Sequence, residues 1–409
     1  MPVMLSIVAR ARPAPQIYNG PMTPADHDRP APLVEPGGPL PEERLRRAQR
    51  QLPLPGFGAP AQARLHAARV LVIGAGGLGS ASVPYLAGAG VGVIGVVDDD
   101  EVELSNLHRQ IAHGTADLGR PKTESLADAV GRLDPGVRVE QHRIRLDSSN
   151  AIELFERYDL IIDGSDNFAT RYLANDAAEL TGRPLVWGAI LQYHGQVGVA
   201  WHRHGPGYRD LFPAPPPPEE VLSCGTGGVL PGLCGTIGSL LATEALKLIT
   251  GLGEPLIGRV LLYDALASRF RELPYGRDPQ AAPVSALVDY ELFCAGSEPL
   301  PASVSAEALA AELSGGSPPR LVDVRTPGEH AARRIAGSAG LPLDALEGSE
   351  AALPWHPAEE PVTVYCERDP RSIRAARVLA SRGVEARYLR GGVVALAAVA
   401  PQLLEGGDV

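Results

Sequence analysis

The stretch Val70-Leu71-Val72-Ile73-Gly74-Ala75-Gly76-Gly77-Leu78-Gly79 decides the fold of most of this chain. Its apolar run predicts a buried strand, and the G-x-G-x-x-G pattern that follows predicts a tight turn into a helix. Glycines let backbone N–H groups approach a phosphate, and the helix start adds a favourable dipole. Asp98 follows Gly79 by 98 − 79 = 19 residues, where a carboxylate accepts hydrogen bonds from ribose hydroxyls. The stretch therefore predicts a nucleotide site, without saying which nucleotide binds.

Short apolar runs alternate with helical stretches from about residue 40 to residue 250. Such alternation predicts an α/β fold with a Rossmann-like, mostly parallel sheet covered by helices on both faces. The expected strands are Arg69–Ile73, Val93–Val97, Val137–Ile144, Leu160–Ile162 and Val260–Tyr263. The expected helices are Leu78–Ala89, Lys122–Leu133, Ala151–Arg157, Asn167–Leu180 and Gly235–Thr250.

A second, smaller α/β pattern begins at Leu321 and continues to the end of the chain. The length of 409 residues also suits more than one domain, at about 100–200 residues each. We therefore expect a disordered, Pro/Ala-rich tail over residues 1–40 and a nucleotide-binding domain over 41–275. A linker over 276–302 and a smaller domain over 303–409 complete the expected organisation.

The composition excludes several classes of protein. Acidic residues outnumber basic ones by 48 − 37 = 11, so the chain has no global positive field for nucleic acid or an anionic membrane. The four cysteines are too few for a disulfide scaffold and form no C-x-x-C pair, which fits a reducing cytoplasm. The uncharged stretches 71–97 and 221–243 are punctuated by glycine and proline, so we interpret both as core segments and not as membrane spans.

Polar residues gather directly after the predicted strands, at the carboxyl edge of the sheet where ligands bind. They form the segments Asp98-Asp99-Asp100-Glu101-Val102-Glu103-Leu104-Ser105-Asn106-Leu107-His108-Arg109-Gln110, Arg120-Pro121-Lys122 and Asp163-Gly164-Ser165-Asp166-Asn167. Arg109 and Lys122 offer positive charge to phosphate oxygens, and Asp100 or Asp166 offers a carboxylate to Mg²⁺. A hydride-transfer site needs a flat, apolar nicotinamide pocket instead. The set therefore favours nucleotidyl transfer.

These segments resemble those of the MoeB/ThiF family, bacterial relatives of ubiquitin-activating enzymes. The resemblance covers about residues 42–275. It also includes Arg47-Ala48-Gln49-Arg50-Gln51, Pro55-Gly56-Phe57-Gly58, Trp187-Gly188-Ala189, His194-Gly195-Gln196 and Ser223-Cys224-Gly225-Thr226-Gly227-Gly228-Val229. The resemblance implies an enzyme that binds ATP and Mg²⁺ and adenylates the C-terminal glycine of a ubiquitin-like sulfur carrier ending in Gly-Gly.

The same resemblance implies roles for individual residues. Asp98 holds the ribose, and Asp166 binds Mg²⁺. Arg109 and Lys122 face the triphosphate, and Arg50 reaches into the site of a second subunit, so a homodimer is expected. A carboxylate attacks the α-phosphorus in line and pyrophosphate leaves, while Arg, Lys and Mg²⁺ stabilise the transition-state charge. The implied nucleotide-binding set also contains Gly74, Gly76, Gly77, Gly79, Asp100, Asn106, Gln110 and Asn167.

One departure from that family concerns zinc. Its members usually carry two C-x-x-C pairs that bind a structural zinc ion. The corresponding stretches here, Pro206–Asp210 and Arg277–Pro283, contain no cysteine. Because a chain with a large core need not depend on a structural metal, we predict that this protein binds no zinc.

In the smaller domain, a predicted strand over residues 362–365 leads to Cys366, and a helical stretch begins at Ile373. A thiol between a strand end and a helix N-terminus faces converging N–H groups. Arg368 and Arg371 add positive charge, so we expect a lowered pKa for the Cys366 thiol. A persulfide on that sulfur would be held by the same loop. The alternative is a buried, inert cysteine.

Three segments of this domain resemble the rhodanese family over about residues 303–405, namely D-V-R-T-P-G-E-H from Asp323, C-E-R-D-P-R-S from Cys366 and Gly391-Gly392-Val393. Many rhodaneses have glycine where Asp369 stands, and an acid there is expected to weaken the loop's preference for anions. The order of the two domains resembles MoeZ-like adenylyltransferase/sulfurtransferases. It implies that a Cys366 persulfide delivers sulfur to the adenylated carrier, with Cys224 as a relay, to give a thiocarboxylate and AMP.

Two alternative functions are compatible with the same residues. A nicotinamide-dependent oxidoreductase would bind NADH and show no pyrophosphate exchange, and a degenerate, zinc-less scaffold would bind the carrier without any exchange. For Cys224 a structural role is the alternative to the relay, and Cys234 and Cys294 are expected to be structural. The sequence leaves open whether the carrier serves molybdopterin, thiamine, cysteine or tRNA thiolation. The sulfur donor, a cysteine desulfurase or another protein, is equally open.

Overall fold

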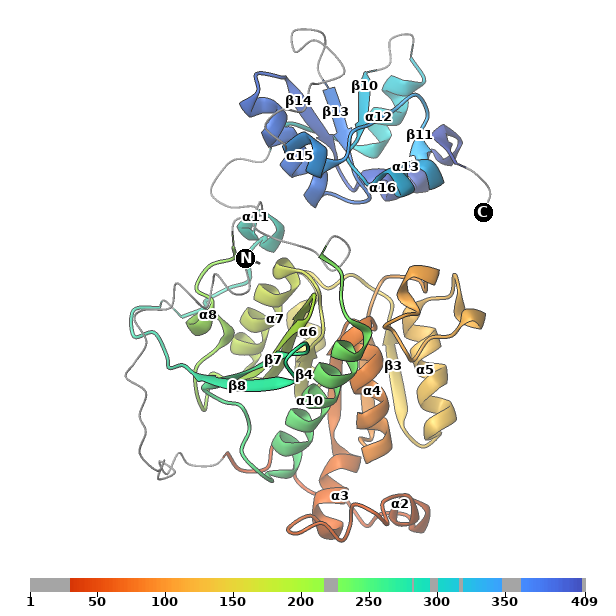
Figure 1. Cartoon of the computed structure of the whole chain (residues 1–409). Coiled ribbons are helices and arrows are strands. Elements are labelled where there is room, and N and C mark those ends of the chain that lie inside the picture. Colours follow the sequence, from red (N-terminus) through yellow and green to blue (C-terminus); the bar gives the residue numbers. More distant parts are fainter. Residues whose placement is uncertain are drawn as a thin grey trace. The chain divides into compact units, whose positions relative to one another are not determined.

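The structure is a computed structural model that describes residues 30–216, 227–281, 283–294, 301–315, 319–347 and 362–406. The described residues form two compact units (Figure 1). Unit 1 lies within residues 30–294, and unit 2 lies within residues 301–406. Each unit has a central, largely parallel sheet between helices, which confirms the predicted α/β fold class.

Unit 1 is built on an eight-stranded sheet of order β3-β2-β1-β4-β5-β6-β7-β8. Strands β1 to β5 are parallel, and β6, β7 and β8 extend the sheet antiparallel. The strands are β1 (Arg69–Ile73), β2 (Val93–Val97), β3 (Arg138–His142), β4 (Leu160–Asp163), β5 (Leu185–Leu191), β6 (His194–Ala200), β7 (Arg259–Asp264) and β8 (Arg269–Pro274). β1 and β2 have the predicted bounds, whereas β5, β6 and β8 are additional to the strands expected from the sequence.

Alternating side chains of the central strands build one core on each face of this sheet. Val70 and Val72 of β1 belong to one buried cluster, and Leu71 and Ile73 belong to the other. Helices α3, α4, α5 and α10 supply the first cluster, and α6, α7, α8 and α11 supply the second. The helices are α2 (Glu42–Arg47), α3 (Gly58–Ala67), α4 (Gly77–Ala89), α5 (Lys122–Leu133), α6 (Ala151–Glu156), α7 (Phe168–Thr181), α8 (Tyr208–Leu211), α10 (Pro231–Thr250) and α11 (Tyr290–Cys294), with 3₁₀ turns at η1 (Leu104–Asn106) and η2 (Thr115–Asp117).

Helix α10 is long and apolar enough to cross a membrane by length and composition, alone among the helices of the described residues. It packs along α4 and against β5 and β6. At Gly238 the two helices are so close that a Cβ would lie 2.6 Å from the Cβ of Ala81. α10 is therefore a core helix of unit 1, and it begins at Pro231, earlier than the predicted Gly235.

Unit 2 has a parallel five-stranded sheet of order β12-β10-β13-β14-β9 and a two-stranded antiparallel sheet of β11 and β15. Buried side chains from α14 and α15 pack on one face of the larger sheet, and those from α12 and α16 pack on the other. Its elements are β9 (Ser303–Val304), α12 (Ala306–Leu313), β10 (Arg320–Asp323), α13 (Pro327–Ala332), β11 (Arg334–Ile335), β12 (Ala339–Gly340), α14 (Leu343–Glu347), β13 (Val362–Tyr365), α15 (Pro370–Ser381), β14 (Ala386–Leu389), α16 (Gly392–Val399), η4 (Pro401–Leu403) and β15 (Leu404–Glu405).

Unit 1 extends beyond the boundaries expected for it at both ends. Leu33, placed by the sequence in a disordered tail, donates its N–H to the carbonyl oxygen of Leu248 at 3.0 Å and packs on the core. In the expected linker, Tyr290 of α11 is buried and donates its hydroxyl to Asp176 Oδ2 at 2.5 Å. Both segments order because their apolar side chains complete a core.

Candidate active sites

The glycines of the phosphate-binding pattern have three different physical reasons to be glycine. Gly74 has a φ of +89°, which L side chains rarely adopt, and its N–H donates to Val97 O at 2.8 Å. Gly79 packs against the turn itself, since a Cβ there would lie 1.9 Å from Gly74 O. A Cβ on Gly76 would meet its nearest neighbour, Gln110 Nε2, only at 3.7 Å. Gly76 thus leaves room beside the loop where a phosphate group can approach.

Asp98, at the end of β2, is tied to this loop through both of its carboxylate oxygens. Oδ2 accepts the N–H of Ala75 at 2.7 Å, and Oδ1 accepts the N–H of Asp100 at 2.8 Å. Burial raises the pKa of Asp98 above its ordinary value, although the nearby Lys122 ammonium acts in the opposite direction. The structure thus brings Asp98 next to the glycine loop, as the motif predicts.

Lys122, the first residue of α5, joins the same group of side chains. Its buried Nζ donates to Asp100 Oδ2 at 3.0 Å. Carboxylate oxygens of Asp98, Asp99 and Asp100 lie within 4.8 Å of one another, and no other group of three metal-ligating side chains occurs among the described residues. Oxygen donors of this kind suit Mg²⁺.

The segment after β2 folds back over the glycine loop. Asn106 is buried and accepts the N–H of Glu103 at 3.3 Å, and Arg109 donates to Ser105 O at 3.2 Å. A Cβ on Gly77 would lie 3.8 Å from Arg109 Cγ, so the arginine stem packs on the loop. Gln110 is buried, and its Oε1 has no hydrogen-bond partner among the described residues. A buried acceptor of this kind needs a partner, which a bound ligand or water can supply.

The end of β4 lies directly against the end of β1. Any Cβ on Gly74 would be 3.3 Å from Gly164 O. Asp166 is exposed, and the side-chain oxygen of Asn167 accepts the N–H of Thr170 at 2.8 Å as the N-cap of α7. The structure therefore gathers the predicted residues of three strand ends at one edge of the sheet.

Arg50 does not lie among these strand-end residues. Its neighbour Gln51 donates Nε2 to Ala89 O at 2.8 Å, which places Arg50 beside the C-terminal end of α4. The glycine loop lies at the N-terminal end of the same helix, about 18 Å away at about 1.5 Å per residue. The exposed Arg50 side chain therefore cannot reach the glycine loop of its own chain.

The described cysteines of unit 1 lie in packed surroundings. Cys234 is buried on α10, where a Cβ on Gly77 would lie 2.8 Å from its Sγ, as its predicted structural role requires. Cys294 packs at the edge of the second core, and burial raises the pKa of its thiol to about 12. Cys224, the predicted relay, lies outside the described residues.

Cys366 directly follows β13, at the start of the loop that leads into α15. The side chain is buried, and Sγ lies 3.5 Å from Ser372 Oγ. The expected lowering of its pKa is wrong. Burial raises the pKa of the Cys366 thiol, and the hydrogen bond with Ser372 and the Arg371 charge oppose that rise without reversing it. The sequence shows the neighbouring charges but not the depth of burial.

The charged side chains around this loop are paired. Arg371 donates to both carboxylate oxygens of Glu329, at 2.8 and 2.7 Å, and Glu367 accepts from Arg325 and Arg333 at 2.7 Å each. Burial acts to raise the pKa of Glu329, but the hydrogen bonds from Arg371 and Thr326 lower it to about 2. No role for Glu329 is expected from the motifs. Its position three residues after Thr326, as a capping box, is the signal that places it.

The two stretches that correspond to zinc-ligand positions are joined by direct hydrogen bonds. Asp210 accepts the N–H of Asp278 at 2.8 Å and that of Gly207 at 2.7 Å. Arg277 donates to Gly205 O at 3.0 Å and also to His202 O. Neither stretch contains a thiol, the ligand type of the structural zinc sites that the family resemblance implies.

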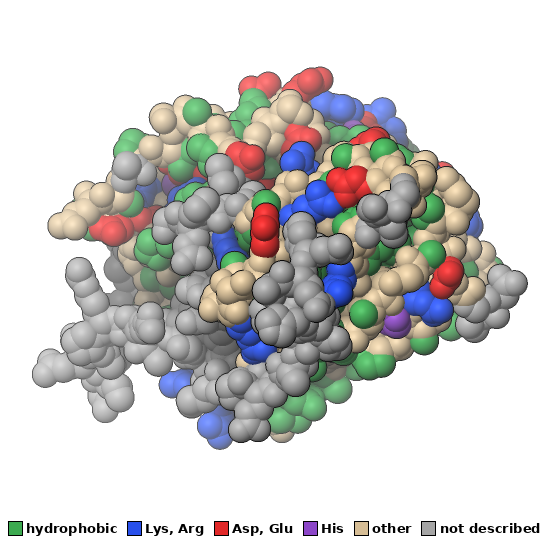
Figure 2. Space-filling model, turned by 90° about the horizontal axis from the view of Figure 1, so that it is seen from above, with side chains coloured by type: hydrophobic (Ala, Val, Ile, Leu, Met, Phe, Trp, Pro, Cys, Tyr) green, Lys and Arg blue, Asp and Glu red, His purple; other side chains and the backbone are tan. Residues whose placement is uncertain are grey.

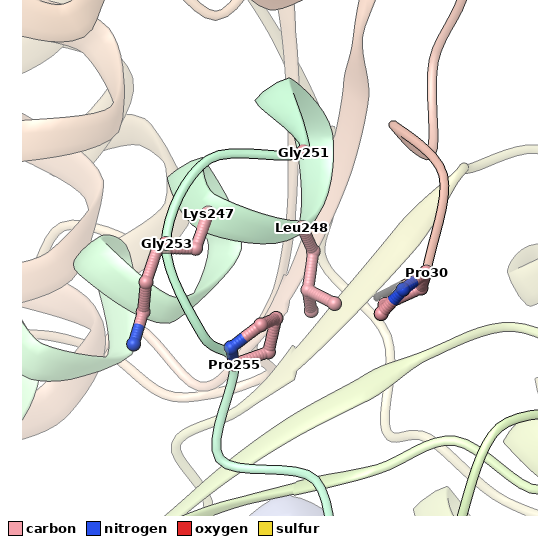
Figure 3. A pocket seen from close by; sticks show the side chains of 6 residues that line it. All are labelled: Pro30, Lys247, Leu248, Gly251, Gly253 and Pro255. Carbon is pink, nitrogen blue, oxygen red and sulfur yellow. The ribbon is translucent and has the colours of Figure 1, made fainter. Parts of the chain in front are cut away.

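Other surface features are not candidates for the chemistry. A pocket at the C-terminal end of α10 is lined by Lys247 and Leu248, by residues of the following loop and by Pro30 (Figure 3). The start of α10, where Leu230 N–H donates to Gln192 O, lies at the carboxyl edge of the sheet, so this pocket lies at the opposite edge. On the face shown in Figure 2, the basic and acidic side chains that are described are interspersed. Among the described residues, this face therefore shows no broad patch of a single charge.

Comparison with known proteins places both units in families. The model of the ThiF family matches residues 48–284, and that of the rhodanese-like domain matches residues 305–398. These matches confirm both resemblances drawn from the motifs.

This chain is similar to proteins named as adenylyltransferases and to proteins named as adenylyltransferase/sulfurtransferases. A probable adenylyltransferase/sulfurtransferase MoeZ of Mycobacterium tuberculosis is 45% identical over 377 residues, which cover 90% of this chain and 96% of that protein. A sulfur carrier protein adenylyltransferase of Thermus thermophilus is 51% identical, covering 62% of this chain and 97% of that protein. An adenylyltransferase and sulfurtransferase MOCS3-2 of Zea mays is 38% identical, covering 88% and 80%.

A solved structure of similar fold is the crystal structure of E. coli MccB with ATP. Its TM-score is 0.53 at 20% identity, and the match covers 60% of this chain and 76% of that one. This likeness concerns the fold alone.

Proposed function

The chain belongs to the ThiF family and carries a rhodanese-like domain C-terminal to its ThiF domain. On this basis we propose how its residues adenylate a sulfur-carrier protein and transfer sulfur to it. It is an adenylyltransferase and sulfurtransferase that uses ATP and acts on a sulfur carrier. The observation that carries the assignment of residues is the meeting of three strand-end loops around the glycine turn of unit 1. The loop that begins at Cys366 in unit 2, here called the thiol loop, supplies the second half of the reaction.

In the first step, a carboxylate oxygen of the carrier's terminal glycine bonds to the α-phosphorus of ATP. The bond from that phosphorus to the pyrophosphate oxygen breaks, and pyrophosphate leaves. The open side of Gly76 gives the phosphates access to backbone N–H groups, and Asp98 has lone pairs left for the ribose. The unpartnered Gln110 Oε1 supports a polar ligand at this edge.

The charges at this edge match the second requirement of adenylation, which is to stabilise a developing negative charge. Arg109 packs on the loop, and Lys122 is held beside it by Asp100. Mg²⁺, held by Asp166 with Asp100 as a further oxygen donor, would act as a Lewis acid towards the phosphate oxygens. An arginine and a lysine already fixed by neighbours need no reorganisation during the reaction.

A homodimer completes this site. Arg50 lies beside the far end of α4 and cannot serve its own glycine loop, yet the family motif gives this arginine a role at the triphosphate. A two-fold dimer resolves the contradiction, because each subunit then supplies Arg50 to the site of the other.

The carrier tail approaches from the same edge of the sheet. The β5–β6 and β7–β8 turns lie at this edge, because β5 ends and β6 begins there and β7 ends opposite the start of β6. Leu266 (71%) and Tyr193 (45%) are exposed in these turns and Phe270 (48%) at the start of β8, and a folded carrier can cover these large apolar side chains. A tail ending in Gly-Gly, with no side chains, suits a narrow path from this surface to the glycine loop.

In the second step, the terminal sulfur of a Cys366 persulfide bonds to the carrier's carbonyl carbon, and the bond from that carbon to the AMP oxygen breaks. A thiolate, for which we propose Cys224, then bonds to the Cys366 sulfur. The S–S bond of the acyl persulfide breaks, and the carrier leaves as a thiocarboxylate. A cellular thiol reduces the resulting disulfide, and a cysteine desulfurase or another sulfur donor renews the persulfide.

The protein does this in the cytoplasm and without zinc. The reducing cytoplasm keeps its thiols free for sulfur chemistry. In place of a metal, Asp210 and Arg277 hold together the stretches 202–210 and 277–278. Loss of the Asp210 carboxylate in Asp210→Ala should lower the melting temperature, while a zinc chelator should leave that of the wild type unchanged. A fall on chelation would show that the protein needs a metal. We propose residues 41–275 as the catalytic domain and 303–409 as the rhodanese domain, with the segments around Leu33 and Tyr290 packed on the core of the catalytic domain.

ATP–pyrophosphate exchange with Gly-Gly-ended carriers tests this proposal. Wild type should exchange label, Asp166→Ala should not, and Cys366→Ala should exchange normally but form no thiocarboxylate. Binding of the carrier without exchange would identify a scaffold, and NADH binding without exchange would identify an oxidoreductase. Loss of exchange in Cys366→Ala would contradict the division of labour between the units.

A further inference from the structure

The loop that follows Cys366 is fastened to the segment that starts α16. Val393 donates its N–H to Cys366 O at 2.9 Å, and Val394 donates to Glu367 O at 3.3 Å. A Cβ on Gly392 would overlap the carbonyl oxygens of Cys366, Glu367 and Arg368, because it would lie 2.4–2.5 Å from each of them. These three carbonyl groups therefore point at Gly392. The loop therefore turns its carbonyl oxygens away from the thiol and towards α16.

Asp369 adds a further fastening from its side chain. Its Oδ1 accepts the N–H of Gly391 at 2.7 Å. Gly391 is the N-cap of α16, with a φ of +74°. A carboxylate at the start of a helix is favoured by the helix dipole, and an N–H bond to a charged acceptor is stronger than one to a neutral acceptor. The Asp369 charge is thus directed at the backbone of α16.

The main chain of Asp369 leads directly to the thiol. Its carbonyl oxygen accepts from Ser372 Oγ at 2.9 Å and from the N–H of Ile373 at 3.0 Å. Ser372 Oγ in turn lies 3.5 Å from Cys366 Sγ. Asp369 therefore connects α16, through its side chain, with the hydroxyl that contacts the sulfur, through its carbonyl.

We propose that Asp369 is a positioning residue for sulfur transfer, whose carboxylate anchors the Cys366 loop to Gly391 so that Ser372 and the loop N–H groups stay directed at the sulfur. The inference rests on the proposed role of Cys366. It reverses the expectation that an acid at this position weakens the loop's preference for anions, because the carboxylate is occupied by the backbone N–H of Gly391.

The test compares three variants of the full chain. Asp369→Asn keeps an oxygen that can accept from Gly391, Asp369→Ala removes the anchor, and Asp344→Ala is the control. Asp344 is an exposed carboxylate of α14, outside this network. Two measurements are made on each variant. One is the rate of thiocarboxylate formation on the carrier from ATP and a low-molecular-weight persulfide. The other is the pH profile of Cys366 alkylation by iodoacetamide, read at the Cys366 peptide by mass spectrometry.

We expect Asp369→Ala to transfer sulfur about tenfold more slowly, as loss of one hydrogen bond to a charged group implies, and to move its alkylation profile to higher pH. Asp369→Asn should stay within about twofold of the wild type, and Asp344→Ala should match it. If Asp369→Ala melts early, both measurements are made well below its melting temperature, where the missing anchor still has to distinguish it from Asp369→Asn.

The outcomes separate the anchor from the proposed function. Thiocarboxylate formation by Cys366→Ala would refute the role of Cys366 itself, whatever Asp369 does. If Cys366→Ala is inactive while Asp369→Ala has wild-type rate and alkylation profile, the anchor is refuted and the role of Cys366 stands. Faster transfer by Asp369→Ala would also refute the anchor and restore the view that the acid repels the anion.

Discussion

Replacing Gly79 by alanine tests the tightest contact of the nucleotide loop. The new Cβ would lie 1.9 Å from Gly74 O, where carbon–oxygen contacts ordinarily need about 3.3 Å. The helix start and the turn must therefore separate by about 1.4 Å, a backbone movement that no side-chain rotation can avoid. Overpacking of this kind costs about 2–3 kcal/mol, a fall of about 5–10 °C in melting temperature for a domain of this size.

The same movement displaces the backbone N–H groups proposed to hold the phosphates. An error of about 1 Å in such positioning costs about 100-fold in rate, and ATP–pyrophosphate exchange measures that loss. Gly88→Ala is the matched control, because it lies in the same helix α4 and its Cβ would meet only Leu133 Cδ2, at 3.9 Å. The control should keep full exchange and gain up to about 1 kcal/mol of stability from helix propensity. Wild-type exchange and melting in Gly79→Ala would refute this account of the loop.

Three further tests use substitutions at Gly76, at Glu329 and at the pair Arg50 and Lys122. Gly76→Ala has room for its Cβ, so its melting temperature should stay unchanged while the KM for ATP rises at least about tenfold, and unchanged ATP kinetics would place the phosphates elsewhere. Glu329 has a pKa lowered from its ordinary 4.5 to about 2, so its ion pair with Arg371 stabilises unit 2 above about pH 4.5 and is lost as the pH falls towards 2. In urea unfolding, the free energy of unfolding of Glu329→Gln should fall less steeply between pH 4.5 and pH 2 than that of the wild type. An equal pH dependence in the two proteins would contradict the pairing. Arg50→Ala and Lys122→Ala should each be inactive alone, but mixed subunits should recover about a quarter of the exchange, whereas no recovery would rule out a shared site.

Much of unit 1 can be predicted from the sequence because its signals are local. β1 and β2 are buried apolar runs that end at a glycine turn or an acidic cluster, and α5 has its predicted bounds, Lys122–Leu133, with one apolar face. The strand-end polar segments then meet because parallel strands place their carboxyl ends at one edge.

The antiparallel part of the sheet is harder to predict. β6 contains two glycines in seven residues, and its side chains are buried on both faces, so it shows neither alternation nor a strong β propensity. The packing of α11 on α7 depends on Tyr290 and Asp176, which are far apart in sequence. No local pattern records such a contact.

The thiol loop shows a further limit of local patterns. The charges around Cys366 can be identified in the sequence, but the burial that raises the pKa of its thiol comes from β13, α15 and α16 together. In the same way, the sequence shows an acid at Asp369 but not that its carboxylate bonds to Gly391. Long-range packing decides both properties.

Intact mass spectrometry of the carrier, after incubation with ATP, Mg²⁺ and a persulfide donor, shows whether adenylation by unit 1 precedes sulfur transfer by unit 2. With wild-type enzyme, we expect a carrier in which one oxygen has been replaced by sulfur. With Cys366→Ala we expect a carrier bearing AMP and no sulfur, and with Asp166→Ala an unchanged carrier. A carrier that gains sulfur without ATP, or never bears AMP in the absence of the thiol, would contradict the claim that unit 1 activates the carboxylate before unit 2 supplies the sulfur.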